Sequence, residues 1–267
     1  MYDNVYAKKF SELASLPKNV PIICHGGGNF GDLYPAHQSY RERLASEFQG
    51  HKLIVFPQSL HFGSDEAMLA SSAIFRKHPN FHLCVRDHDS VDIGRLFTEN
   101  VHLVPDSAHM LWDKIRPAPA GSGRLKFMRI DIESAGQAGE SSRDWETLSS
   151  PTFYKTQAFM QRLTKSISRR PTTFSSNIAF ALWMREVRRS INEARTQFAP
   201  YEVVETDRLH GMLFSLLLRK PVAFRDNSVK KLSRYAQTWL GDLSGSWVRA
   251  VNDSSYTPAP ARTEEQN

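Results

Sequence analysis

Apolar runs alternate with helix-like segments along the first half of the chain, and this order constrains the fold more than any other feature. Four runs rich in branched residues read VPIICH, KLIVFPQS, FHLCVRD and VHLVPDSA. Segments with helical periodicity, such as YPAHQSYRERLASEF and SDEAMLASSAIFRKH, separate them. Because such alternation is typical of βα units, whose strands lie side by side in a parallel sheet, we predict an α/β protein.

A linker-like segment interrupts this pattern and suggests two domains. The segment RPAPAGSGR covers residues 116–124, and after it the pattern resumes with LKFMRID, long helical stretches, YEVVETD, RLHGMLFSLLLRK and PVAFRDN. We expect two Rossmann-like domains with parallel sheets facing a cleft, over residues 1–118 and 119–250. We expect residues 251–267 to form a disordered tail.

The charge of the chain favours an anionic partner. The net charge is +6 and the isoelectric point is near 9.3, which does not distinguish phosphate ligands, nucleic acid and anionic lipid. The segment from Lys155 to Arg195 contains nine basic residues, and its only acidic residues are Glu186 and Glu193. This cluster is either a solvated helical face or a surface that meets anionic lipid or polysaccharide. It lacks the interleaved aromatic residues of a recognisable motif for nucleic-acid binding, so we expect no nucleic-acid partner.

Apolar segments and cysteines indicate the compartment. The apolar stretch in HGMLFSLLLRK is too short to span a bilayer, and the opening MYDNVYAKKF lacks the apolar core of a signal peptide. The two cysteines, Cys24 and Cys84, lie in apolar runs and are expected to be buried thiols rather than a disulfide or metal pair. We therefore expect a soluble cytoplasmic protein.

Polar residues follow the apolar runs, where ligands of open α/β sheets bind. The glycine-rich stretch HGGGNFGDLYPAHQ follows the first run, with a predicted helix after it whose first-turn amides could face an anion. Taken singly, these residues also fit a tight turn, a local salt bridge or a structural histidine. The candidates from the first half are Gly27, Gly28, Asn29, Asp32, Gln58, His61 and Arg86.

The stretch TDRLHG, residues 206–211, is the sharpest candidate in the second half. Asp207 can cap the following helix, Arg208 offers a planar fork for a carboxylate or phosphate, and His210 is a candidate acid or base. Further along, DNSVKK adds Lys230 and Lys231 at the next strand end. Such a set of residues suits a small, highly charged ligand.

Several motifs together resemble those of bacterial polysaccharide pyruvyl transferases, over roughly residues 22 to 240. In chain order they are GGGNFGDLYPAHQSYRERL, FPQSLHF, VRDHDS, VPDSAHML, RIDIES, TDRLHGMLFSLLLRKPVAFRDNS and RYAQTW. The resemblance implies a fold like that of GT-B glycosyltransferases. It also implies transfer of pyruvate from phosphoenolpyruvate onto two hydroxyls of a sugar, as a cyclic ketal, with release of phosphate.

The resemblance also implies roles for residues. By motif position, the residues that hold the donor, phosphoenolpyruvate, are Arg86, Arg208, His210 and Lys231, and we add Leu209 and Ser228 as further candidates for donor binding. The family pattern has an aromatic residue and a glycine before its lysine, where this chain has Val229 and Lys230, so Lys230 is an alternative to Lys231. His210 is the expected general acid or base because its pKa can lie near the working pH.

The acceptor side is assigned to the residues after the first two strands. Gly27, Gly28, Asn29, Asp32, Gln58 and His61 form this group. Asp32 is the candidate to bind or deprotonate acceptor hydroxyls, although this segment can also bind the donor phosphate. The expected acceptor is a lipid-linked oligosaccharide at the inner face of the plasma membrane. No metal-binding cluster stands out, so we expect neither a metal nor a cofactor beyond phosphoenolpyruvate as co-substrate.

Two other functions stay open at this point. A nucleotide-sugar glycosyltransferase of GT-B type would need an acidic residue for the ribose, and Glu205 or Asp207 could serve. A non-catalytic polysaccharide-binding or assembly protein could keep the same fold without turnover. Binding of a nucleotide sugar would support the first alternative, and absence of turnover would support the second.

Overall fold

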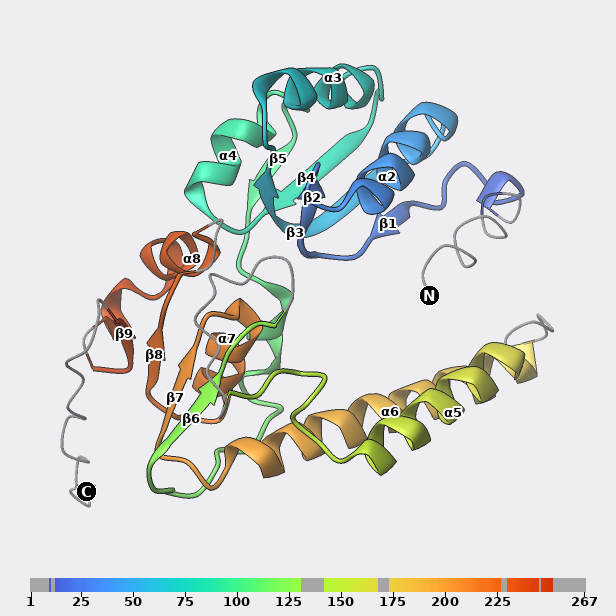
Figure 1. The fold of residues 1–267 in the computed structure, drawn as a ribbon. Helices are drawn as coiled ribbons and strands as arrows, with labels where there is room; N and C mark the ends of the chain where they lie inside the picture. Colours follow the sequence, from blue (N-terminus) through green and yellow to red (C-terminus); the bar gives the residue numbers. More distant parts are fainter. Residues whose placement is uncertain are drawn as a thin grey trace. The chain divides into compact units, whose positions relative to one another are not determined.

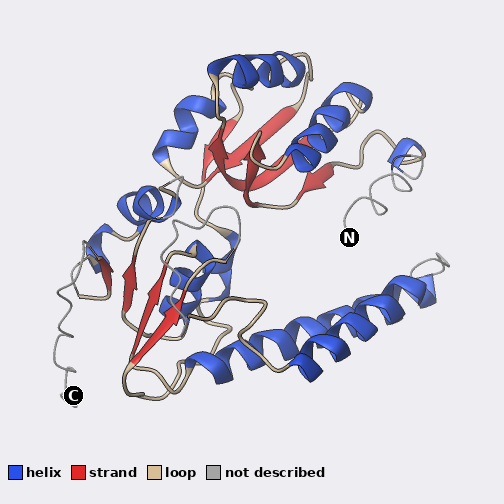
Figure 2. Cartoon of the chain, viewed as in Figure 1, coloured by secondary structure: helices blue, strands red, loops and turns tan. Residues whose placement is uncertain are grey.

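The computed structural model describes residue 10 and residues 13–130, 142–167, 173–226, 230–244 and 246–251. The chain divides into two compact units, residues 1–111 with 229–242 and residues 112–228 with 243–267. Each unit contains one parallel β-sheet with helices (Figure 1, Figure 2), so the predicted α/β class is confirmed. The boundaries predicted from the sequence remain a prediction, and in the structure residues 229–242 group with the first unit. All but the first residue of the predicted tail lies outside the described residues.

The sheet of the first unit is parallel throughout, with the order β1-β3-β4-β5 and with β2 also paired to β3. Its strands are β1 (Ile22–Cys24), β2 (Gly27–Gly31), β3 (Leu53–His61), β4 (Phe81–Val85) and β5 (Val101–Leu103). The helices are α2 (Pro35–Glu47), α3 (Asp65–Phe75), α4 (His88–Gly94), the 3-10 helix η1 (Ser107–Leu111) and α8 (Lys231–Trp239). The predicted order of strands and helices therefore holds, apart from β2 and α8.

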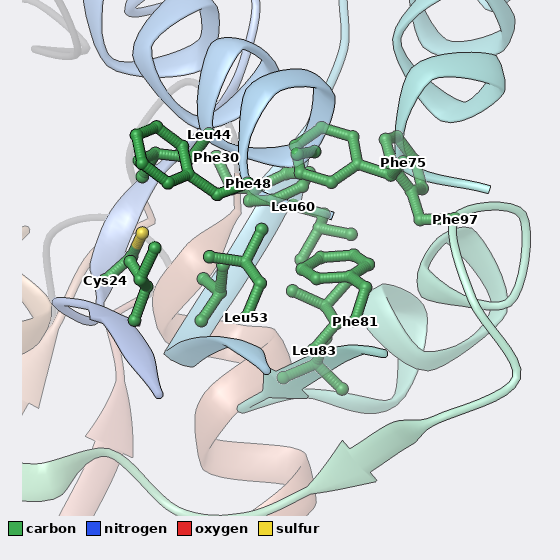
Figure 3. Close-up of a cluster of buried hydrophobic side chains, with 14 of the residues drawn as sticks. Cys24, Phe30, Leu44, Phe48, Leu53, Leu60, Phe75, Phe81, Leu83 and Phe97 are labelled. Atoms are coloured by element: carbon green, nitrogen blue, oxygen red, sulfur yellow. The ribbon is translucent and has the colours of Figure 1, made fainter. Parts of the chain in front are cut away.

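Side-chain alternation places the core of the first unit on one face of its sheet. In β1, Ile22 is buried and Ile23 is 52% exposed, the pattern of a strand with one covered face. Residues from β3 and β4 join residues of α2 and α3 in one apolar cluster (Figure 3). The cluster includes Cys24, Phe30, Leu44, Phe48, Leu53, Leu60, Phe75, Phe81, Leu83 and Phe97. This cluster fixes the strand ends that carry the candidate site.

The second unit is built on a four-stranded parallel sheet in the order β6-β7-β8-β9. Its strands are β6 (Arg124–Phe127), β7 (Val203–Thr206), β8 (Val222–Phe224) and β9 (Val248–Ala250). Its helices are α5 (Pro151–Ile167), α6 (Thr173–Phe198), α7 (Leu209–Leu217) and the 3-10 helix η2 (Gly241–Leu243). Strand β7 is buried at every position, as expected for a central strand of a covered parallel sheet.

Aromatic packing closes the second core. The Phe198 ring, at the end of α6, lies 5.2 Å from the Phe127 ring of β6 and 5.2 Å from the Phe214 ring of α7, measured between centroids. Trp145 stacks on Phe198 at 6.2 Å. Within the part of the chain that the structure describes, no helix combines the length and the apolar character needed to cross a membrane.

Candidate functional site

The glycine-rich segment forms strand β2 and not the turn that the sequence suggested. Strand β2 continues along the edge of β3 that β1 also pairs with, and Gly31 lies opposite His61. A Cβ atom at Gly31, where φ is +128°, would lie 1.6 Å from the carbonyl oxygen of His61. Only glycine permits this approach of two backbones. Helix α2 begins at Pro35, after Asp32, Leu33 and Tyr34, so the glycines do not lead directly into its N-terminus.

Arg86 is buried where β4 ends, and several groups fix its position. Its side chain is 2% exposed, and Nη1 donates to Asp106 Oδ2 at 2.6 Å while Nε donates to Ser59 Oγ at 2.9 Å. Ser59 in turn donates to Asp87 Oδ2 at 2.7 Å. Asp87 caps α4 by accepting a hydrogen bond from the backbone of Ser90. The guanidinium therefore has a defined orientation without a ligand.

Lys231 brings a second cation to the same place. It is the first residue of α8, its side chain is buried, and its Nζ donates to the carbonyl oxygen of Gly28 at 2.8 Å. A Cβ atom at Gly28 would lie 2.8 Å from Lys231 Nζ and 3.1 Å from Arg86 Nη2. Because Gly28 has no side chain, Lys231 Nζ and Arg86 Nη2 both approach the position that a Cβ atom would occupy. This is the arrangement that an anionic group needs.

Helix α8 reaches this position because it is anchored to the strand ends of the first unit. Trp239 Nε1 donates to the carbonyl oxygen of Arg86 at 2.9 Å, and the backbone N–H of Asp106 donates to Tyr235 Oη at 3.0 Å. Tyr235 is fully buried, and burial raises the pKa of its hydroxyl, which stays protonated. Arg234 pairs with Asp89 of α4 at 2.8 Å. Each contact ties α8 to a residue near Arg86.

Gln58 and Asn29 are polar groups that serve the local structure. Gln58 is fully buried, donates to the carbonyl oxygen of His25 at 2.8 Å and accepts from the backbone of Asn29 at 3.4 Å. Both oxygens of Asn29, backbone and side chain, accept hydrogen bonds from the buried Arg41. The structure therefore places Asn29 on Arg41, a partner that the sequence did not suggest.

Asp32 lies at the end of β2 beside the end of β3. It is exposed, and its Oδ2 accepts a hydrogen bond from the backbone of Gly63 at 2.7 Å. His61, the last residue of β3, is half-buried, and Gly27 begins β2 with a φ of +138°. The acceptor candidates are therefore neighbours along the β2–β3 edge, and Asp32 is the carboxylate among them that is open to solvent.

In the second unit, a single carboxylate holds Arg208. Arg208 precedes α7, and both its Nε and its Nη2 contact the carboxylate of Asp144, which is fully buried. Asp144 also accepts from the backbone N–H groups of Ile130 and Trp145 at 3.0 and 2.7 Å. Asp144 was not among the site residues predicted from the sequence. Its segment has no strand pattern, and only its acidic side chain ahead of a helical stretch could have marked it.

The neighbours of Arg208 differ in their access to solvent. His210 is exposed in the first turn of α7, whereas the side chain of Leu209 is buried and leaves only its backbone to offer a ligand. Asp207 is 1% exposed, so burial raises the pKa of its carboxyl, although a 2.7 Å hydrogen bond from the backbone of Arg129 opposes the rise. Among the described residues, Asp207 Oδ2 has no hydrogen-bond partner. The predicted helix cap at Asp207 is wrong, because Arg208 is the capping residue.

The remaining candidates are Ser228, Lys230 and a metal site. Ser228 lies outside the described residues, and Lys230 is exposed just before α8 with a left-handed φ of +52°. Across the described ranges, no group of three His, Cys, Asp or Glu side chains could hold a metal ion. Cys24 and Cys84 are both free thiols, as predicted, but only Cys24 is buried and Cys84 is half-buried. Burial raises the pKa of Cys24 to about 11.

Comparison with known proteins adds a family. Residues 1–229 match the family model described as polysaccharide pyruvyl transferase. EpsO of Bacillus subtilis (strain 168), which is designated a candidate pyruvyl transferase, is 35% identical over 91% of this chain and 77% of its own length. Pyruvyl transferase 1 of Schizosaccharomyces pombe (strain 972 / ATCC 24843) is 31% identical over 91% of this chain and 62% of its own.

A solved structure supports the fold alone. The crystal structure of a functionally uncharacterised protein from Klebsiella pneumoniae subsp. pneumoniae NTUH-K2044 superposes with a TM-score of 0.55 at 20% identity. The match covers 93% of this chain and 86% of that one. It is compatible with a Rossmann-like arrangement of parallel sheets and helices.

Proposed function

Because the chain belongs to the polysaccharide pyruvyl transferase family, we propose that it transfers the pyruvyl group of phosphoenolpyruvate to a sugar of an exopolysaccharide repeat unit. Two hydroxyls of the sugar form a cyclic pyruvate ketal, and phosphate is released. In this proposal the two units are Rossmann-like domains of a GT-B-like enzyme with the substrates in a cleft.

The observation that carries the donor proposal is the approach of Arg86 and Lys231 to Gly28. Phosphoenolpyruvate has a carboxylate and a phosphate, so its site needs several cations that are fixed before it binds. Arg86 Nη2 and Lys231 Nζ lie 3.1 and 2.8 Å from the position that a Cβ atom of Gly28 would fill. Because both side chains are buried, each attracts an anion more strongly than it would in water.

Position 231 suits the donor lysine better than position 230. Lys231 is buried beside Arg86, whereas Lys230 is exposed. The family pattern has a glycine where this chain has Lys230, and the left-handed φ of +52° found there is one that glycine adopts without strain. The backbone geometry therefore supports aligning Lys231 with the family lysine.

The proposed reaction uses His210 for proton transfer. A proton delivered to the methylene carbon of phosphoenolpyruvate makes a methyl group and leaves the central carbon cationic. One sugar hydroxyl bonds to this carbon and loses its proton. The phosphate then leaves with the C–O electron pair, and the second hydroxyl closes the ketal and loses its proton. Arg86, Arg208 and Lys231 stabilise the departing phosphate, and Asp144 orients Arg208.

The proposed acceptor is a lipid-linked oligosaccharide, bound along the β2–β3 edge. Asp32 is exposed at this edge and can accept a proton or a hydrogen bond from a sugar hydroxyl. Gly27, Gly28, Gln58 and His61 lie on the same strands. We propose that the reaction needs no metal and no cofactor besides the donor.

Two observations weigh against a nucleotide-sugar glycosyltransferase. Glu205 accepts hydrogen bonds from Arg124 at 3.1 Å and Arg225 at 2.9 Å, so its carboxylate is already engaged. Asp207 is 1% exposed and receives a hydrogen bond from the backbone of Arg129. Neither acid is open to a ribose.

The test measures phosphate release from phosphoenolpyruvate with and without galactosyl and glucosyl oligosaccharides. We compare the wild-type protein with Lys231→Met and with Lys230→Met, which removes the adjacent, exposed ammonium group. We expect sugar-dependent release, with kcat/KM lowered about 100-fold or more in Lys231→Met and changed less than about two-fold in Lys230→Met. Mass spectrometry of the sugar identifies the ketal, and an Arg208→Ala/His210→Ala variant gives the background rate.

Other results would contradict specific parts of the proposal. Equal losses of kcat/KM in the two lysine variants would show that Lys231 does not hold the donor. If the folded protein releases no phosphate with any acceptor and binds a uridine diphosphate sugar tightly, it is a glycosyltransferase. If it binds the oligosaccharides without turnover, it is a non-catalytic polysaccharide-binding protein.

A further inference from the structure

Helices α5 and α6 pack side by side and form an arm that extends from the sheet of the second unit (Figure 1). The end of α6 belongs to the core, where Ala194 and Phe198 are 8% and 0% exposed. At about 1.5 Å per residue, the earlier part of this helix continues well beyond the sheet. We call residues 151–167 and 173–198 the helical arm.

An apolar stripe runs along α6 where the helix has left the core. Phe180, Trp183, Met184 and Val187 have the spacing of residues on one side of a helix. Phe180 is 62% exposed and Trp183 is 53% exposed, and their rings lie 6.1 Å apart between centroids. Large exposed aromatic side chains in adjacent positions indicate a surface that contacts something other than water.

Exposed positive charges border this stripe. Arg188 is one helical turn after Met184, Arg185 is nearby on the same helix, and both are exposed. Neither forms an ion pair with any residue that the structure describes. Lys155 and Arg162 of α5 are also exposed and have no ion pair within the described ranges.

Acidic groups on the arm do not offset this charge. Glu186 is 9% exposed and pairs with Arg189 at 3.1 Å, and Glu193 accepts a hydrogen bond from Gln197. A second copy of the chain would therefore bring like charges together at this surface. Charge complementarity instead requires an anionic occupant, and the exposed aromatic rings require one with an apolar layer.

We propose that the helical arm binds the surface of an anionic lipid bilayer. Phe180 and Trp183 enter the interface between head groups and acyl chains, and Arg185 and Arg188 lie among the anionic head groups. Binding through both effects is reversible and weakens as salt screens the charges. The proposal does not depend on the transferase reaction, and its test needs no substrate.

The test is flotation of the full chain with vesicles of phosphatidylcholine alone or with one quarter phosphatidylglycerol. We expect binding to the anionic vesicles only, and less binding in high salt. In Trp183→Ser/Arg188→Gln the apparent affinity should fall about 20-fold or more, since one surface cation alone accounts for about five-fold. Leu69→Ser/Lys77→Gln, which removes an exposed apolar and a basic side chain from the first unit, should bind like the wild type.

Three results would overturn the proposal. Equal flotation of the arm variant and the wild type would assign binding to another surface. Binding to single-stranded oligonucleotides without binding to vesicles would make the occupant a nucleic acid. A dimer that the arm variant abolishes, together with no flotation of either protein, would assign the stripe to contact between two copies. Circular dichroism of each variant checks that α6 is still folded.

Discussion

Arg86 of the first unit and Arg208 of the second each lie beside a buried carboxylate, yet they are held in different ways. The side chain of Arg86 is 2% exposed and distributes its hydrogen bonds over Asp106 and Ser59. The side chain of Arg208 is 16% exposed and directs two nitrogens at one residue, Asp144. Asp106 and Ser59 therefore fix Nη1 and Nε of Arg86, and its Nη2 approaches Gly28. In Arg208, by contrast, Nε and Nη2 both contact the carboxylate of Asp144.

The two arginines therefore differ in how their guanidinium groups are held before a ligand binds. Arg86 is fixed before any ligand binds, so little reorganisation is needed at the proposed donor site. Arg208 is closer to water, and its carboxylate partner competes with an incoming anion. Substitutions of the two carboxylates measure how far the two arginines differ.

The largest expected effect is that of Asp106→Asn. The substitution leaves the guanidinium of Arg86 buried without its opposite charge, so the free energy of unfolding should fall by roughly 3–5 kcal/mol. Urea unfolding followed by circular dichroism measures the change. Asp32→Asn is the control, since it alters an exposed carboxylate with a single backbone contact and should lower the free energy by less than about 1 kcal/mol. Equal effects would show that Arg86 is not held by charge.

Asp144→Asn should have a smaller effect on stability. Water reaches Arg208 and partly replaces the lost carboxylate, so we expect a decrease of about 2 kcal/mol in the free energy of unfolding. The same variant should bind phosphoenolpyruvate at least as tightly as the wild type, because the competing charge is gone. Isothermal titration measures this affinity. A decrease as large as that of Asp106→Asn would remove the distinction between the two arginines.

The smallest effect is expected for Glu205→Gln, and it depends on pH. Burial raises the pKa of Glu205, but the hydrogen bonds and charges of Arg225 and Arg124 outweigh burial and leave the pKa below its ordinary value of 4.5. The charged form therefore stabilises the fold above pH 4.5, and this contribution is lost as the pH falls through the lowered pKa. We expect Glu205→Gln to lower the free energy of unfolding by about 1 kcal/mol at pH 7, since both partner arginines are partly exposed to water. A difference that stayed constant down to pH 3 would contradict this account.

Most of the fold followed from periodicity, and two parts did not. The strands at Leu53–His61 and Val203–Thr206 are apolar and branched, so their local pattern matches their place in a sheet. Strand β2 was missed because glycine is disfavoured in strands, and its pairing depends on backbone contact with β3. The grouping of α8 with the first unit depends on Tyr235 and Trp239, whose partners are distant in the sequence.

The candidate site was predictable where the rule for strand ends applied. Arg86 and Lys231 were selected from their positions, but the sequence did not show that Gly28 lies between them. Asp144 was missed, since it lies in a segment between a strand and a helix where no local pattern indicates a buried carboxylate for Arg208. The assignment of Asn29 to the acceptor side stays a prediction, and the sequence did not indicate that Arg41 engages both its oxygens. Side-chain partners across a fold depend on tertiary packing, which periodicity does not encode.

The return of α8 to the first unit also sets an order of events on the ribosome. Synthesis completes residues 1–111 long before residues 229–242 emerge. At 5–20 residues per second, the delay is roughly ten seconds. During translation the nascent first unit lacks Tyr235 and Trp239 at its strand ends. Lys231, the second cation beside Gly28, is also synthesised long after Arg86. The proposed donor site is therefore assembled late in biosynthesis, after most of the second unit has left the ribosome.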